Sequence, residues 1–325
     1  MQEQLISKAK EMLQSGSVNR VLGWKKGEFF YDITPAIFET ADELDKEFVF
    51  NEFCGANFSK YLVEESKKDG KVLVFMKPDD TYSFLQLMKE HRVVRENVYI
   101  IGIPATDMAD IRKIRDKGIE GITGIKSEGD NFIVSTIYGD ETVAKADVLE
   151  ERCINRKTTK HVVYDELMGD EGEYLTDSKR FDEVAKLEAM TPDERFKFWQ
   201  NELSRCIRCN ACRNVCPACT CTNCVFDNMN SGIANKAAAN SFEESNYHII
   251  RAFHVAGRCT DCGECSRVCP QNIPLHLLNR KFIKDINELY GFYQAGANED
   301  EKYPTTNFTF DDCEASVVYE RGGDK

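Results

Sequence analysis

The stretch from Cys206 to Cys269 decides the class of fold, because it contains two copies of one cysteine pattern. The first copy is CIRCNACRNVCP (206–217) and the second is CTDCGECSRVCP (259–270). Both read C-x2-C-x2-C-x3-C-P, the spacing of bacterial ferredoxins, in which three thiolates hold one 4Fe-4S cluster and the fourth cysteine binds the other cluster. We therefore expect two cross-ligated 4Fe-4S clusters. One would be held by Cys206, Cys209, Cys212 and Cys269, and its neighbour by Cys259, Cys262, Cys265 and Cys216.

The spacing suits an iron-sulfur cubane, since two-residue gaps let one loop reach three neighbouring corners while a distant cysteine binds the fourth. Pro217 and Pro270 then turn the chain away, because proline fixes φ and lacks an amide hydrogen. Zinc needs four ligands in all, usually as two C-x2-C pairs, whereas the two runs supply eight thiolates. A zinc-binding structural adaptor is the alternative to the iron-sulfur interpretation.

Composition limits the compartment and the partners. Eleven of the 14 cysteines lie between positions 206 and 269, and the N-terminal sequence MQEQLISKAKEMLQSG has no signal-peptide pattern, so we expect metal sites in a reducing cytoplasm. The net charge of −13 disfavours nucleic acid, whose binding depends on Lys and Arg neutralising phosphates. No apolar run reaches the length of a membrane helix, so we expect no membrane insertion.

The first 164 residues have the pattern of a small α/β domain. Residues 71–77 and 97–104 are short apolar runs typical of buried strands, and each is followed by a helical pattern, at 81–91 and 108–118. Strand, helix, strand, helix with short connections predicts parallel βαβ units. An amphipathic helix is expected before them at 2–14, and a strand meander after them at 121–148.

The second half has the pattern of a mainly helical, ferredoxin-like dicluster domain at 191–293. Thr191-Pro192-Asp193-Glu194 is a strong helix start, and further helical patterns occupy 242–257 and 275–293. The insertion between the two cysteine runs is too long for a compact βαβ ferredoxin. We interpret the acidic segment 165–190 as a solvated linker, and the acidic residues 294–325 as a C-terminal arm.

Three more cysteines, Cys219, Cys221 and Cys224, follow the first run immediately. They predict either a third metal site, zinc or iron-sulfur, or a group of reduced and partly buried thiols. A third site would need a fourth ligand from elsewhere, and the remaining cysteines are Cys54, Cys153 and Cys313.

The usual signatures of catalysis are missing from the sequence, and we predict no catalytic residue. It has no G-x-G-x-x-G after a strand, no P-loop and no G-x-S-x-G, which removes the usual evidence for a dinucleotide site, a P-loop or a hydrolase. A flavin site without such a fingerprint stays open.

The segments CIRCNACRNVCPACTCTNC (206–224) and GRCTDCGECSRVCPQNIPL (257–275) resemble the iron-sulfur beta subunits of coenzyme F-420-linked hydrogenases and formate dehydrogenases, and their bacterial relatives that accompany heterodisulfide-reductase-like flavoproteins. The segments KVLVFMKPDD, RENVYIIGIPATDMADI and LEERCINRKTTKHVVYDELMG extend the resemblance over most of the chain. This sequence departs from the family where relatives carry further cysteines, since it has Asp79-Asp80, Pro104-Ala105 and the pair Cys153 and Arg156. The resemblance implies that the α/β domain has lost its own cluster and kept its fold.

Together these features predict a non-catalytic electron-transfer subunit of an anaerobic oxidoreductase complex. The resemblance implies redox partner subunits: a flavoprotein of heterodisulfide reductase type, a hydrogenase, a formate dehydrogenase or a methylene-folate reductase. The rival interpretation is a flavin-containing subunit that reduces a soluble electron carrier such as coenzyme F-420. The departures weaken that interpretation, because they change the domain that would do this chemistry.

Overall fold

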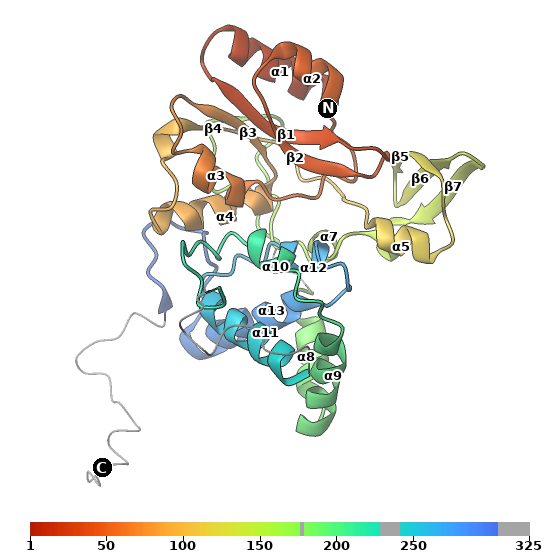
Figure 1. Cartoon of the computed structure of the whole chain (residues 1–325), viewed down its shortest axis with the longest axis vertical. Helices are drawn as coiled ribbons and strands as arrows, with labels where there is room; N and C mark the ends of the chain where they lie inside the picture. Colours follow the sequence, from red (N-terminus) through yellow and green to blue (C-terminus); the bar gives the residue numbers. More distant parts are fainter. Residues whose placement is uncertain (176–178, 228–240, 305–325) are drawn as a thin grey trace.

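A computed structural model describes residues 1–175, 179–227 and 241–304 of the chain. Figure 1 shows an α/β half above and a helical half below, and places α10 (Ala211–Asn214), α12 (Glu264–Arg267) and α7 (Glu151–Ile154) where the halves meet. Both α10 and α12 carry predicted cluster ligands. The cysteine loops therefore lie at the junction of the two halves.

The main sheet of the α/β half has five strands in the described residues, in the order β2-β1-β3-β4-β8. The pairs β1–β3, β3–β4 and β4–β8 are parallel, as the sequence predicted, whereas β2 pairs with β1 in antiparallel orientation. The predicted parallel sheet is thus a mixed sheet. Its strands are β1 (Arg20–Lys26), β2 (Ile33–Phe38), β3 (Val72–Met76), β4 (Val98–Gly102) and β8 (Glu166–Leu167).

Apolar side chains on both faces of β3 explain its central place, because all five of its residues are buried. The helices of this half are α1 (Gln2–Gln14), α2 (Ala41–Glu47), α3 (Ser59–Glu65), α4 (Pro78–Lys89), η1 (Arg95–Asn97), α5 (Ile111–Asp116), α6 (Lys145–Val148) and α7. Helix α4 starts three residues earlier than the apolar rhythm predicted, since Pro78 fits the first helical turn. Lys77 is then the whole connection from β3 to α4.

The predicted meander is confirmed as a separate antiparallel sheet, β5 (Ile122–Glu128), β6 (Asn131–Thr136) and β7 (Gly139–Ala144). Phe132 and Val134 are fully buried in a small core of their own with Ile114 of α5. Burial alternates along β6, so Phe132 and Val134 lie on the face of this sheet that packs into the core. Figure 1 shows the meander beside the main sheet.

The helical half contains α8 (Asp182–Ala189), α9 (Pro192–Ser204), α10, α11 (Ser241–Val255), α12 and α13 (Leu275–Tyr290). Helix α9 begins with the predicted capping box, in which Thr191 Oγ1 accepts the amide of Glu194 and the Glu194 carboxylate accepts the amide of Thr191. Its last turn buries Leu203 beside Cys212 and Cys269. Helix α9 therefore delivers the chain into the first cysteine loop.

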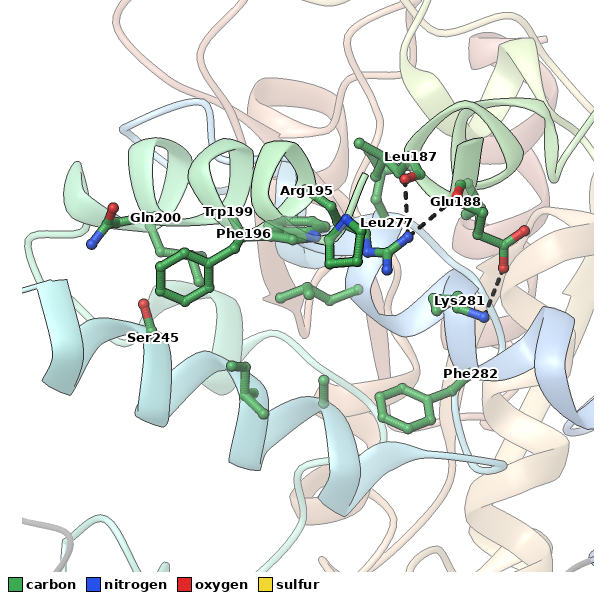
Figure 2. A pocket seen from close by; sticks show the side chains of 16 residues that line it. Leu187, Glu188, Arg195, Phe196, Trp199, Gln200, Ser245, Leu277, Lys281 and Phe282 are labelled. Atoms are coloured by element: carbon green, nitrogen blue, oxygen red, sulfur yellow. Dashed lines mark hydrogen bonds and ion pairs between the residues drawn. The ribbon is translucent and has the colours of Figure 1, made fainter. Parts of the chain in front are cut away.

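The acidic segment 165–190 is more ordered than a solvated linker, which corrects the sequence interpretation. Its first residues form β8, and its end forms α8, whose Val184 is buried against Leu277 of α13. Figure 2 shows how polar contacts fasten α8: Arg195 donates to the carbonyl of Leu187 (3.4 Å), and Lys281 lies 2.7 Å from Glu188. A few buried apolar residues outweigh the acidic composition here.

The described start of the predicted C-terminal arm also packs. Tyr293 and Ala295 are buried, and Lys89 of α4 donates to the carbonyl of Glu301 (2.6 Å). Residues 305–325, which include Cys313, lie outside the described residues. Among the helices of the described ranges, none combines the length and the apolar character of a membrane-spanning helix.

Candidate metal centre

The two cysteine runs fold into matching loops. Arg208 and Asn210 have left-handed backbone angles (φ 56° and 62°), and so do Asp261 and Gly263 at the equivalent positions of the second run (φ 57° and 74°). In each loop the amide two residues after the first cysteine points to its sulfur, at 3.3 Å in the first run and 3.4 Å in the second. A short helix follows each loop. Equal spacing has therefore produced equal backbone geometry, as two ligand loops of one kind require.

The first predicted ligand group is gathered around one small cavity. Its lining includes Cys206, Cys209, Cys212 and Cys269, together with apolar atoms of Ile273 and Leu275. Cys269 comes from the second run, so the structure brings together the set that cross-ligation predicts. Burial raises the pKa of Cys206 and of Cys212 to about 11. Thiolates here consequently need a nearby positive charge, which iron would supply.

The second predicted group shows the same exchange between runs. The Cys216 thiol of the first run lies close enough to raise the pKa of Cys259, Cys262 and Cys265, although burial is the larger cause at each. Cys265 of the second group also lies near Cys212 of the first. Burial raises the pKa of Cys212, the charge of Arg251 partly opposes this rise, and the Cys265 thiol adds to it. The two groups are neighbours. Ligation by these eight residues remains a prediction.

Arg251 of α11 is the residue that the sequence analysis missed. Its side chain is 2% exposed, and its Nε and Nη1 have no hydrogen-bond partner among the described residues. Burial lowers the pKa of Arg251, but the thiols of Cys265, Cys212, Cys216 and Cys219 outweigh burial and raise it. Unpaired buried donors carry a large cost, so acceptors are expected here. Cluster sulfides are such acceptors, and the donor set fits iron-sulfur clusters.

A helical period on α11 could have revealed this face. Tyr247, His248, Arg251 and Val255 recur at intervals of three or four residues and are all buried. His248 Nε2 lies 3.2 Å from Cys206 Sγ, and burial followed by the charge of Arg251 lowers the pKa of His248 to about 3. His248 is therefore neutral and contacts the first group without adding charge.

The arginines that flank the cysteines in the sequence are ion-paired. Arg208 lies 3.4 Å from Glu244, Arg213 lies 2.9 Å from Asp227, and Arg267 lies 2.6 Å from Glu264. Arg205 pairs with Glu202, and Arg258 with Glu90. Each of these five arginines therefore has a carboxylate partner.

Buried ion pairs also hold the second loop. Asp261, between Cys259 and Cys262, accepts from Arg180 (2.6 Å) and from Arg280 (3.1 Å). Burial raises the pKa of Asp261, but the charges of Arg280 and Arg180 outweigh burial and lower it well below its usual range. The ionised carboxylate fixes the loop from two sides, and so fixes the neighbouring thiols.

The three additional cysteines line a separate cavity, and the proposed fourth ligands do not. Cys219, Cys221 and Cys224 share it with Lys60, Arg251 and other cations. Cys54 is buried beside Asn51, and Cys153 Sγ accepts the amide of Met108 (3.3 Å), so both belong to the α/β half. Cys313 is outside the described residues.

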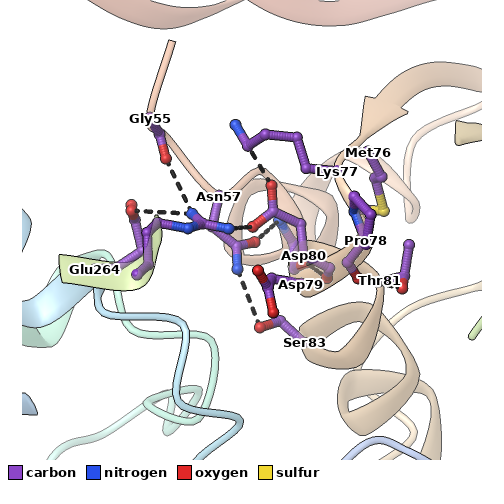
Figure 3. A network of polar contacts seen from close by, with 12 residues as sticks. Gly55, Asn57, Met76, Lys77, Pro78, Asp79, Asp80, Thr81, Ser83 and Glu264 are labelled. Atoms are coloured by element: carbon purple, nitrogen blue, oxygen red, sulfur yellow. Dashed lines mark hydrogen bonds and ion pairs between the residues drawn. The ribbon is translucent and has the colours of Figure 1, made fainter. Parts of the chain in front are cut away.

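Polar side chains occupy the positions where the family resemblance implied lost cysteines. Asp79 lies 2.8 Å from Lys157, and Asp80 lies 3.7 Å from Lys77 and 2.5 Å from Arg152. Figure 3 shows Lys77 and Asp80 in this network, with Glu264 of α12 facing it from the helical half. Ala105 is only partly buried, and Arg156 donates to the carbonyl of Thr106 (2.8 Å). The α/β half therefore contacts the dicluster half through charge pairs.

Comparison with known proteins agrees with this geometry. Residues 202–273 match the 4Fe-4S dicluster domain family. The loops therefore belong to an iron-sulfur domain. Within the described ranges, no three side chains of His, Cys, Asp or Glu converge as they would around a single metal ion.

Relatives extend the similarity to most of the chain and confirm the resemblance inferred from the sequence. The chain is 25% identical over 342 aligned residues to the F420-dependent formate dehydrogenase subunit beta of Methanocaldococcus jannaschii, and the alignment covers 87% of this chain and 89% of the relative. It is 22% identical to the F420-dependent formate dehydrogenase 1 subunit beta of Methanococcus maripaludis, covering 67% and 72% of the two chains.

One solved structure is also similar. A chain of the xenon-derivatised F420-reducing NiFe hydrogenase complex from Methanosarcina barkeri aligns with a TM-score of 0.38 and 12% identity, covering 63% of this chain and 90% of that one. Neither value is high enough to bear on fold or function.

Proposed function

We propose that this chain relays single electrons through two 4Fe-4S clusters between partner subunits of an anaerobic oxidoreductase complex, and makes or breaks no bonds itself. The observation that carries the proposal is the exchange of Cys216 and Cys269 between the two ligand groups. With this exchange, each cysteine run would bind both clusters, and the two clusters would lie next to each other. Electrons then move between neighbouring centres through the domain, whose potentials depend on charge, hydrogen bonds to sulfur and exposure.

The buried face of α11 supports the same proposal. Arg251 approaches thiols of both groups, and its Nε and Nη1, which have no hydrogen-bond partner within residues 1–175, 179–227 and 241–304, suit cluster sulfur. A fixed positive charge beside a cluster favours the reduced form, because reduction adds negative charge. Arg251 would thus raise the potential of whichever cluster lies nearer.

The partners and the compartment are proposed from the relatives. Two relatives are F420-dependent formate dehydrogenase beta subunits. We infer that this chain also works beside catalytic subunits in the cytoplasm, where its donors and acceptors are a heterodisulfide-reductase-type flavoprotein, a hydrogenase, a formate dehydrogenase or a methylene-folate reductase.

Substitution of one cysteine in each group tests the relay. Cys209→Ala and Cys262→Ala should each remove one cluster and stop electron transfer through the native complex, while partial reactions at each partner persist. Cys54→Ala is the control, because Cys54 lies in the core of the α/β half. Full turnover of the complex with both cluster variants would reject the relay.

A second candidate function, flavin binding, is favoured by a cavity of about 950 Å³. Its lining includes Tyr82, Lys157, Arg180 and Gln294. Among the described residues, Tyr82 Oη, Arg180 Nη2 and Gln294 Oε1 are buried without a hydrogen-bond partner. A flavin would supply hydride and single-electron chemistry there, and these polar groups would hold its polar edge between aromatic rings.

The cavity adjoins the second cysteine loop through Arg180, which donates to Asp261. Anaerobic incubation with FAD or FMN, followed by gel filtration, tests this candidate. It predicts one bound flavin per chain, lost in Arg180→Met and retained in the exposed control Arg115→Met, whose guanidinium donates to Tyr31 Oη outside this cavity. Absence of bound flavin in the wild-type chain would remove the candidate without affecting the relay.

A further inference from the structure

The loop after the first cysteine run lines a cavity that neither predicted cluster occupies. The cavity measures about 340 Å³ and lies between this loop, α3, α10 and α11. Its lining includes three cysteines, four cationic side chains and one carboxylate: Cys219, Cys221, Cys224, Lys60, Arg213, Arg251, Arg258 and Asp227. Thiols and cations in one cavity suit a group that binds thiolates and carries net negative charge.

The loop is held in place by the α/β half of the molecule. Lys60 of α3 donates to the carbonyl of Cys219, and Arg92 donates to the hydroxyl of Thr220 (2.9 Å) and to its carbonyl. These contacts join residues 159 and 128 positions apart in the sequence. Two cations of one half therefore fix the backbone between the first and second of the three thiols, as a preorganised ligand loop requires.

We propose that Cys219, Cys221 and Cys224 hold a third iron-sulfur cluster, one corner of which is not bound by cysteine. The proposal rests on the proposed iron-sulfur function of the other eight cysteines. It adds a centre next to the second group, because the thiols of Cys216 and Cys219 are in hydrogen-bonding contact. The third cluster would extend the relay toward the face formed by α3 and α11.

A cluster fits this cavity better than a single zinc ion. Zinc bound to thiolates at about 2.3 Å brings the sulfurs to about 3.8 Å from one another. No three ligand side chains converge so closely in the described residues, and the three cysteines instead surround a cavity of about 340 Å³.

Arg251 provides the independent support. It lines this cavity as well as contacting the two predicted cluster groups, and its buried Nε and Nη1 have no partner in the part of the chain that the structure describes. Lys60 adds positive charge, whereas Arg213 and Arg258 line the cavity but are already paired with Asp227 and Glu90. An anionic group with several sulfur acceptors would satisfy the buried donors of Arg251 and offset its charge.

The fourth corner distinguishes this cluster from the other two. The described lining supplies three cysteines and the carboxylate of Asp227, whereas Cys54 and Cys153 do not line the cavity and Cys313 lies outside the described residues. A corner held by a weaker ligand releases its iron more readily than a corner held by thiolate. Mild oxidation should therefore convert this cluster to a three-iron centre, whereas the two clusters held by four cysteines each should persist.

Cys221→Ser tests the proposal, and the exposure of Cys221 makes the substitution safe for folding. Anaerobically reconstituted wild-type chain should contain about twelve irons, and Cys221→Ser about eight, because each cubane contains four. The three-iron signal after mild oxidation should be lost with them. Cys153→Ser is the matched control, since serine can keep the contacts of that sulfur with Met108 and Thr106, and its iron content should equal that of wild type.

Two results would overturn the third cluster. One is about eight irons in wild type with unchanged iron in Cys221→Ser, and the other is one zinc per chain that the same substitution removes. Both leave the proposed relay intact, because its eight cysteines lie outside this loop. If the relay proposal is itself wrong, the wild-type chain should instead contain far fewer than about eight irons.

Discussion

The guanidinium of Arg152 lies 2.5 Å from the carboxylate of Asp80, and both side chains are almost fully buried. Arg152 also donates to the carbonyl of Gly55 (3.1 Å) and lies 3.8 Å from Glu264, which stands between two predicted cluster ligands. Figure 3 shows Asp80 and Glu264 on the two sides of this network. One buried cation thus connects the first turn of α4 with the second cysteine loop.

Removal of Arg152 should weaken the joint between the two halves. Arg152→Met removes the shared partner of Asp80 and Glu264, but Lys77 and Arg267 remain, so the loss of unfolding free energy should stay below the about 3 to 5 kcal/mol of a fully unpaired buried charge. Anaerobic thermal denaturation of the chain reconstituted with iron-sulfur clusters measures this loss of stability. Lys160→Met removes an exposed pair with Glu171 and should leave the midpoint unchanged. Equal midpoints for the two variants would show that the Arg152 pairs do not hold the halves together.

Arg251 should set a cluster potential. Arg251→Met removes a positive charge beside the thiols, so reduction becomes less favourable and one potential should fall by on the order of 60 mV, a tenfold change for one electron. Arg251→Lys retains the positive charge, so the cluster potential in this variant should fall less. Redox titration followed by electron paramagnetic resonance measures both variants. A potential that rises, or equal shifts in both variants, would contradict this role.

Cross-ligation makes a prediction about pairs of variants. Cys269→Ser should leave the same residual spectrum as Cys206→Ser, because both would lack the first cluster. Cys216→Ser should match Cys259→Ser instead. If each run instead held its own cluster, the spectrum of Cys269→Ser would match that of Cys259→Ser, and the spectrum of Cys216→Ser would match that of Cys206→Ser. Electron paramagnetic resonance of the four reduced variants separates the two arrangements.

Glu151 should make stability depend on pH. Burial raises its pKa, but the hydrogen bond and charge of His276 and the charge of Arg280 outweigh burial and lower the pKa to about 2. The folded pKa is thus depressed below the unfolded value of about 4.3. Glu151 then contributes stability that is present above about pH 4.3 and is lost as pH falls toward 2.

Thermal denaturation of wild type and Glu151→Gln between these pH values measures the effect. The wild-type midpoint should approach that of Glu151→Gln as pH falls, whereas Glu120→Gln, an exposed control, should follow wild type throughout. A constant difference between wild type and Glu151→Gln over this range would contradict the assignment.

Strand and helix rhythm predicted most of the architecture, because β3 and β4 are apolar runs and α9 carries its own capping signal. The sequence did not predict α8, since its few buried residues stand in an acidic segment. The eight cluster ligands were predicted from the spacing of the cysteines alone. The sequence analysis missed Arg251, because a buried cation becomes visible only when distant thiols surround it.

The α/β half shows the same limit. The resemblance implied that Asp79 and Asp80 replace family cysteines, but their partners Lys157 and Arg152 are 78 and 72 residues away. No local pattern predicts pairs that form only when strands and helices from both ends of the domain meet.

The most direct measurement is electron paramagnetic resonance of the oxygen-free chain, reduced in steps. Two adjacent cubanes should give, at full reduction, a complex spectrum of magnetically coupled spins, preceded by simpler signals at partial reduction. Separate, uncoupled signals would contradict the adjacent clusters that cross-ligation by Cys216 and Cys269 predicts. Absence of any reducible paramagnetic centre would contradict the iron-sulfur relay itself.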